Sequence, residues 1–210
     1  MDKEQEILLN EGRLLPILEE FYSLQGEGFH TGKAAYFARI GGCDVGCHWC
    51  DVKESWNVAS CPPVDVDQII RNAAGYPAKA VVITGGEPLL YNLDYLSKGL
   101  HDKGLETFLE TSGSSPLSGQ WDWICVSPKK DSPPLPEIFP KADEIKVIIE
   151  EFKDFEWAEK NAACVPDDCL LFLQPEWSIR DAMIPLIVKY IQSHPKWKIS
   201  LQSHKYMGIP

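Results

Sequence analysis

Short apolar runs alternate with segments of helical periodicity along most of this chain, and this alternation constrains its fold more than any other feature. The runs typical of strands cover residues 17–23, 35–40, 79–83, 106–109, 123–126, 144–149, 169–173 and 198–201. The segments typical of helices cover residues 65–74, 93–103, 151–161 and 179–193. Strand, helix and strand in this order predict an α/β fold, a parallel sheet whose strands are connected by crossover helices.

The alternation is incomplete in the middle of the chain. Residues 111–120 are rich in Ser, Gly and Pro, and residues 127–143 contain five prolines, so neither segment is predicted to be helical. A complete eightfold barrel usually needs about 250 residues, more than the 210 present here. We therefore expect a partial, open parallel (β/α) barrel with a reduced number of helices.

The composition argues against several classes of partner. Lys and Arg total 20 against 31 Asp and Glu, a net charge of −11, whereas nucleic acids and anionic membranes are bound by dense cationic surfaces. No apolar run approaches the roughly 18 residues of a membrane span, and residues 1–6 lack the features of a secretory signal. The seven cysteines are an odd number and three lie within eight residues, which is not a disulfide framework. We expect a cytoplasmic protein that binds neither nucleic acid nor membrane.

Polar residues follow almost every predicted strand. These clusters lie at residues 24–28, 41–43, 84–88, 110–113, 127–129, 174–177 and 202–205. In parallel barrels the active site is built where the strands end at their carboxyl termini. We expect these clusters to form one polar rim around the site, although turns are polar for other reasons too.

Cys43, Cys47 and Cys50 form a C-x3-C-x2-C motif. Thiolates are the ligands of iron–sulfur clusters, and a [4Fe–4S] cluster normally takes four of them. Three on one tight loop would leave one iron open to another ligand.

Two alternatives to a cluster remain open for this motif. A structural zinc ion needs four ligands, and Cys61 could be the fourth, although Pro62 and Pro63 stiffen its surroundings. The cysteines could also be unliganded. Of the remaining cysteines, Cys125 is predicted to lie in the core, and we expect no role for Cys164 or Cys169.

The cysteine motif, together with Gly85-Gly86-Glu87-Pro88 after a later strand, resembles the radical S-adenosylmethionine (SAM) superfamily. In that superfamily the three cysteines hold a [4Fe–4S] cluster, and the open iron binds the methionine part of SAM. The Gly-Gly-Glu-Pro segment offers backbone groups to the amino group of SAM. Glycines permit this close approach because they carry no Cβ.

Within the superfamily, the chain from about residue 19 to its end resembles the 7-carboxy-7-deazaguanine synthase family. The motifs that carry the resemblance are Phe21-Tyr22-Ser23-Leu24-Gln25-Gly26-Glu27-Gly28, Phe37-Ala38-Arg39, the cysteine loop with Asp51, Thr84 to Pro88, Glu110-Thr111, Val126 to Lys129, Leu173-Gln174-Pro175 and Gln202 to Pro210. This family converts 6-carboxy-5,6,7,8-tetrahydropterin into 7-carboxy-7-deazaguanine and ammonia, on the route to queuosine and related deazapurines. The alternative within the superfamily is an activase of glycyl radical enzymes, which would share the cysteine motif and the glycine segment alone.

The resemblance implies roles for individual residues. Cys43, Cys47 and Cys50 would bind the cluster. Residues implied at the SAM site are Trp49, Asp51, Gly86, Ser127, Pro128, Lys129, Gln174, Pro175, Glu176 and Trp177. Residues implied at the pterin are Leu24, Gln25, Gly26, Arg39, Thr84, Glu110, His204 and the terminal carboxylate of Pro210, with Glu27 just behind them. No side chain is implied as a catalytic residue, because a radical derived from SAM removes hydrogen from C6 of the pterin.

The resemblance also implies partners for this protein. A low-potential electron donor such as flavodoxin would reduce the cluster, and a homodimer is compatible with the family.

The chain departs from the family pattern in two places. Residues 1–18 form an extension to a single domain of residues 19–210. Many family members place Thr or Ser after Cys-Asp to help hold Mg²⁺, which prefers oxygen ligands. This chain has Val52 there, so we expect weak or absent dependence on Mg²⁺.

Overall fold

The structure, a computed structural model, describes residues 3–210. The strands are β1 (Leu14–Leu24), β2 (Ala34–Ile40), β3 (Pro63–Asp65), β4 (Ala80–Gly85), β5 (Glu106–Thr111), β6 (Trp123–Val126), β7 (Glu144–Ile149), β8 (Leu170–Pro175) and β9 (Trp197–Ile199). The α-helices are α1 (Lys3–Asn10), α2 (Val66–Ala74), α3 (Asp94–Asp102), α4 (Asp154–Ala162), α5 (Arg180–Ser193) and α6 (Ser203–Met207). Short 3₁₀ turns, among them η1 (Lys53–Trp56) and η5 (Trp177–Ile179), lie between them.

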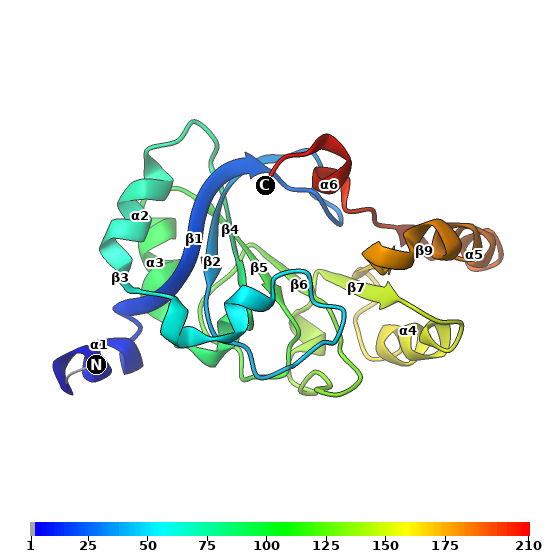
Figure 1. Cartoon of the computed structure of the whole chain (residues 1–210), viewed down its shortest axis with the longest axis horizontal. Helices are drawn as coiled ribbons and strands as arrows, with labels where there is room; N and C mark the ends of the chain where they lie inside the picture. The colour runs from blue at the N-terminus through cyan, green and yellow to red at the C-terminus, as the bar shows by residue number, and fades with distance from the viewer. Residues whose placement is uncertain (1–2) are drawn as a thin grey trace.

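All the described strands join one nine-stranded sheet in the order β3-β1-β2-β4-β5-β6-β7-β8-β9 (Figure 1). From β2 to β9 every pairing is parallel. The two ends of this order, β3 and β9, do not pair with each other, so the sheet is open. The predicted mostly parallel, unclosed α/β fold is confirmed, and no α-helix follows β5 or β6, as the proline-rich segments indicated.

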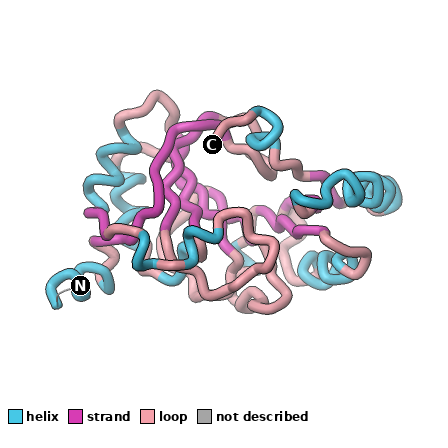
Figure 2. The backbone as a smooth tube through the Cα atoms, viewed as in Figure 1, coloured by secondary structure: helices cyan, strands magenta, loops and turns pink. Residues whose placement is uncertain are grey.

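The two faces of the sheet differ in chemistry. Ile83, Leu109 and Ile145 point outward and are fully buried with residues of the helices, which lie outside the curved strands in Figure 2. Residues of the opposite parity, such as Phe37 and Phe108, point to the concave face, because successive strand residues alternate between faces. The large core therefore lies between the sheet and its helices and leaves the concave face for a site.

The prediction that every polar cluster lies at one rim is wrong for residues 24–28. β1 runs antiparallel to β2, and Leu24 pairs with Ala34, so the connecting residues 25–33 lie at the amino-terminal ends of the parallel strands. We call residues 25–33 the floor loop. Phe29 of this loop stacks on Trp123 with ring centroids 5.0 Å apart, and its backbone N–H donates to Glu144 at 3.0 Å. A strand's direction depends on its partners, which the local pattern does not reveal.

The N-terminal segment contributes to the core. Leu15 and Ile17 are buried residues of β1, so the division between residues 18 and 19 falls inside a strand. The helices α1 and α6 and the short strand β3 had no predicted counterpart. Among residues 3–210, no helix is long and apolar enough to cross a membrane.

Candidate active site

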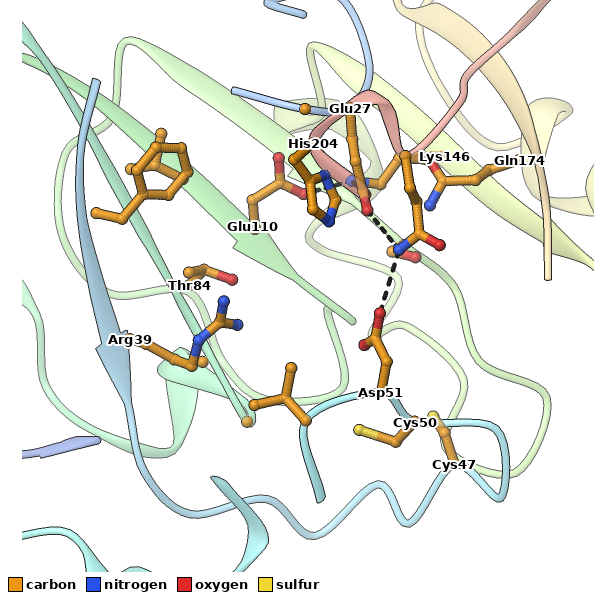
Figure 3. Close-up of a pocket in the computed structure, with 18 of the residues that line it drawn as sticks. Glu27, Arg39, Cys47, Cys50, Asp51, Thr84, Glu110, Lys146, Gln174 and His204 are labelled. Atoms are coloured by element: carbon orange, nitrogen blue, oxygen red, sulfur yellow. Dashed lines mark hydrogen bonds and ion pairs between the residues drawn. The ribbon is translucent and has the colours of Figure 1, made fainter. Parts of the chain in front are cut away.

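A cavity of about 440 Å³ opens on the concave face of the sheet (Figure 3). All eight residues predicted to contact the pterin line it: Leu24, Gln25, Gly26, Arg39, Thr84, Glu110, His204 and Pro210. The cavity is also lined by the three motif cysteines and by Trp49, Asp51, Gly86, Ser127, Lys129 and Gln174. Residues separated by almost 190 positions in sequence are therefore brought to one site.

Four residues predicted near SAM do not line this cavity. Pro128 lines an adjoining pocket of about 200 Å³, whereas Pro175 is the last residue of β8 and Glu176 and Trp177 follow it. The Glu176 carboxylate accepts from the backbone N–H of Ser178 at 3.0 Å, so it caps the η5 turn. The Trp177 ring centroid lies 4.0 Å from the Arg180 guanidinium and 4.9 Å from the ammonium of Lys205, a residue that lines the cavity.

Cys43, Cys47 and Cys50 lie on the loop between β2 and η1, and all three are free and partly buried. Burial raises the pKa of the Cys43 and Cys47 thiols, while the nearby Lys129 ammonium acts in the opposite direction on Cys47. Within residues 3–210, no three His, Cys, Asp or Glu side chains converge on a single ion. In an iron–sulfur cube each thiolate binds a different iron, so the chemistry of this donor set fits a cluster.

The zinc alternative depends on Cys61, which the structure does not place beside the motif cysteines. Cys61 is buried against Gly41, where its sulfur lies 2.2 Å from the position that a Cβ would occupy. It does not line the cavity with the motif cysteines. Cys125 is buried on β6, as predicted for a core position.

The glycine segment packs directly on the cysteine loop. A Cβ on Gly86 would lie 2.1 Å from the backbone oxygen of Gly42, and the Glu87 N–H donates to that same oxygen at 2.9 Å. The buried Glu87 carboxylate accepts from the Thr111 hydroxyl at 2.5 Å and from the Ser112 N–H at 2.8 Å. The segment is thus fixed to β5 on one side and open to the cavity on the other.

On the other wall, Arg39 and Thr84 occupy paired positions of β2 and β4. The Nε of Arg39 donates to the Glu19 carboxylate at 2.7 Å, and the guanidinium lies 5.9 Å from the Phe21 ring centroid. Within residues 3–210, the terminal nitrogens of Arg39 have no protein partner and remain available to an anion.

Lys146 is the main residue that sequence reasoning missed. It points inward from β7, and its ammonium lies 2.6 Å from Glu27 and 2.8 Å from Glu110. Gln25 donates to the other oxygen of Glu110 at 3.2 Å. Burial opposes ionisation of Glu27, but Lys146 lowers the pKa of this carboxyl to about 2. Glu27 lines the cavity rather than lying behind it, and a charged residue inside the apolar run of β7 was the available signal.

The C-terminal segment covers the cavity. The Gln202 amide donates to Glu27 at 2.9 Å and to Asp51 at 3.2 Å. Lys205 forms an ion pair with Asp51. His204 packs so tightly on Gly26 that a Cβ there would lie 2.0 Å from its Nδ1. Burial lowers the pKa of His204, which favours the neutral form of its imidazole.

Comparisons with known proteins agree with this architecture. Residues 38–126 match the radical SAM superfamily. A 7-carboxy-7-deazaguanine synthase of Flavobacterium psychrophilum is 53% identical over 210 residues, covering 100% of both chains. The synthase of Synechocystis sp. is 48% identical over 194 residues, 92% of this chain and 93% of that one.

A solved structure is similar over nearly the same length. The crystal structure of QueE from Escherichia coli superposes with a TM-score of 0.81 at 30% identity, covering 97% of this chain and 100% of that chain. Identity at this level over full-length chains, with the same fold, establishes common ancestry. The chain therefore belongs to the 7-carboxy-7-deazaguanine synthase family of the radical SAM superfamily.

Proposed function

We propose that this protein converts 6-carboxy-5,6,7,8-tetrahydropterin into 7-carboxy-7-deazaguanine and ammonia by a radical mechanism. Because a carbon–nitrogen bond is broken and ammonia leaves, the enzyme is a carbon–nitrogen lyase. One observation carries the proposal: the residues expected at the pterin line the same cavity as the three motif cysteines. A glycyl radical activase has no need for this set of small-molecule contacts and is not favoured.

Cys43, Cys47 and Cys50 would hold a [4Fe–4S] cluster, and SAM would bind beside it. When bound, these groups supply a 5′-deoxyadenosyl radical after one-electron reduction. The chain's own contribution is to hold SAM in one orientation. Backbone groups of Gly86 lie at the cysteine loop, and the Lys129 ammonium donates to the Ser127 hydroxyl at 2.7 Å, which fixes both side chains at the cavity wall.

Further residues are assigned to the SAM side of the cavity. Those that line it are Trp49, Asp51 and Gln174. Pro128 borders the adjoining pocket, and Pro175, Glu176 and Trp177 shape the turn that follows Gln174. We assign this last group an indirect role, supporting the wall rather than contacting the cofactor.

The opposite side of the cavity suits the pterin. The free guanidinium nitrogens of Arg39 can form a bidentate pair with the substrate carboxylate. At the aminopyrimidinone edge, the Gln25 amide can donate or accept hydrogen bonds, and the carboxylates of Glu110 and Pro210 can accept them. Leu24, Gly26, Thr84 and His204 complete the wall, which also excludes water from the radical.

The proposed partners follow from this chemistry. A low-potential donor such as flavodoxin would supply the electron, since the cluster must be reduced before SAM is cleaved. The net charge of −11 suits a small-molecule enzyme of the cytoplasm better than one that binds nucleic acid. We retain a homodimer as part of the proposal.

The decisive experiment is anaerobic turnover. The reconstituted protein is incubated with 6-carboxytetrahydropterin, SAM and dithionite, and the products are identified by mass spectrometry. We expect 7-carboxy-7-deazaguanine, and no product from Cys43→Ala, Cys47→Ala or Cys50→Ala. Cys164→Ala is the matched control, because Cys164 is exposed and far from the motif in sequence. Full turnover by a motif variant, or none by the wild type, would contradict the proposal.

A further inference from the structure

Lys146 is a buried cation that none of the roles above uses. It lies in the centre of β7, where Ile145 and Val147 on either side are fully buried in the outer core. Its own side chain is 5% exposed and points the other way, toward the cavity that it lines. Its two partners come from different parts of the fold: Glu27 from the floor loop and Glu110 from β5.

Stability alone does not explain a lysine at this position. Removing an ammonium and its partners from water costs several kcal/mol, and apolar residues of similar volume are often as stabilising as a buried ion pair. Phe172, at the register position beside Lys146 on β8, shows that an apolar side chain is accommodated in this row. A role in holding other groups in place accounts for the lysine better.

The geometry around Glu110 indicates which group is held. One oxygen accepts from Lys146 at 2.8 Å and the other from Gln25 at 3.2 Å. With both oxygens fixed, the carboxylate has one orientation, and its remaining lone pairs are available for donors in the cavity. An aminopyrimidinone edge presents N–H donors, which only the ionised form of a carboxyl group accepts at both oxygens.

We propose that Lys146 is a positioning residue that orients the Glu110 carboxylate to accept N–H groups of the pterin. This inference rests on the proposed function, since it assigns Glu110 to the substrate. Lys146 does not touch the pterin in this account. It acts through Glu110, and its pair with Glu27 fastens the floor loop beneath the same site.

Several titratable groups surround Lys146 and Glu110, and they set the direction of the pH effect. They are Glu27, Glu144, Cys125, Lys129 and His204. Burial raises the pKa of Glu144, and Lys146 counteracts that rise. Without Lys146, Glu27 and Glu110 would be two neighbouring carboxyl groups with no cation between them. Burial would then raise the pKa of Glu27, and as the pH falls the protonated Glu27 would donate to Glu110 in competition with the pterin.

The test measures pterin affinity of the reconstituted holoenzyme by anaerobic calorimetry, with unreduced cluster and SAM present, from about pH 6 to about pH 9. The variants are Lys146→Met, Glu27→Gln and the double variant Glu27→Gln/Lys146→Met. Lys146→Met should bind the pterin on the order of tenfold more weakly than the wild type at the acidic end of this range, and its affinity should recover as the pH rises. The wild type and Glu27→Gln both keep the Lys146–Glu110 pair. Their pterin affinities should therefore depend on pH in the same way.

The double variant distinguishes the effect of the Lys146 charge from the effect of changing the size and shape of the side chain at this position. It should bind more tightly than Lys146→Met at the acidic end, because the remaining carboxylate has no second carboxyl group beside it. If Lys146→Met does not fold, as judged by its melting curve, the double variant is compared with Glu27→Gln, and weaker pterin binding by the double variant is still expected because Glu110 has lost its Lys146 partner.

Two results would overturn the inference. One is a loss of affinity that is the same at every pH, and the other is a double variant that binds no better than Lys146→Met. Wild-type turnover distinguishes these results from failure of the proposed function. If the wild type forms 7-carboxy-7-deazaguanine while the variants behave in either of these ways, only the role of Lys146 is wrong.

Discussion

At the scale of single residues, Arg39 is the best candidate to bind the substrate carboxylate. Its Nε is engaged by Glu19 and its side chain is 19% exposed, so the terminal nitrogens are held in one plane at the cavity. Arg39→Lys keeps the positive charge but loses the planar guanidinium that binds a carboxylate through two hydrogen bonds. We expect kcat/KM for the pterin to fall by an amount that corresponds to roughly 1–3 kcal/mol of transition-state stabilisation. SAM cleavage without pterin should fall much less. Equal losses in the two assays would mean that Arg39 is a structural residue.

Val52 is the second residue whose identity makes a prediction. It lines the cavity next to Asp51, and its carbonyl oxygen already accepts from the N–H and hydroxyl of Ser55 at 3.0 and 2.7 Å. The isopropyl group offers Mg²⁺ no oxygen. We therefore expect turnover after chelation to respond little to added Mg²⁺ in the wild type and to respond more in Val52→Thr. Strong stimulation of the wild type by Mg²⁺ would contradict this prediction.

At the scale of elements, the C-terminal segment acts as a wall of the site. The Ser23 hydroxyl donates to a terminal oxygen of Pro210 at 2.9 Å, and Figure 1 shows the C-terminus beside the end of β1 and away from α1. Adding a single Gly after Pro210 moves the terminal charge out of this contact. We expect pterin turnover to fall on the order of tenfold or more, because a charged acceptor is lost.

The matched control for this prediction is one Gly added before Met1, which leaves the C-terminus unchanged. Both variants are assayed for turnover and for uncoupled SAM cleavage. Equal turnover by the two extended proteins would show that the terminal carboxylate does not contact the substrate.

At the scale of the whole molecule, the buried charge network predicts an acid-sensitive fold. The pKa of Glu27 is about 2 in the folded protein, whereas a glutamate without such partners, as in the unfolded chain, has a pKa of 4.5. A depressed carboxyl pKa stabilises the fold above the unfolded value, and this contribution is lost as the pH falls from about 4.5 to about 2. For Glu27 it amounts to at most roughly 3 kcal/mol.

Denaturant unfolding between about pH 6 and about pH 2 measures this contribution. The free energy of unfolding should depend less steeply on pH in Glu27→Gln than in the wild type. Glu137→Gln, a substitution at an exposed position, should follow the wild-type curve. Parallel curves for all three proteins would rule out Glu27 as a source of acid sensitivity.

Local patterns in the sequence determined much of this protein. Each predicted strand and helix has a counterpart within a few residues, because apolar periodicity reports directly on which face of a segment is buried. The spacing of Cys43, Cys47 and Cys50 is likewise a local property, since three thiols on one short loop need no other part of the chain to bring them together. The motifs also indicated a common site, although only the fold brings Arg39, Glu110 and Pro210 to one cavity.

The tertiary structure alone decided the direction of β1 and the partners of Lys146. Residues 24–28 look like any polar turn after a strand, but β1 pairs antiparallel with β2 and carries them to the opposite end of the sheet. Lys146 looks like an isolated charge in an apolar run, and its partners Glu27 and Glu110 lie far from it in sequence. Strand pairing and buried ion pairs are contacts between distant segments, and their energies depend on what the fold places opposite each residue. The sequence by itself therefore determined the elements and the chemistry of the site, and tertiary packing decided how its charges are held.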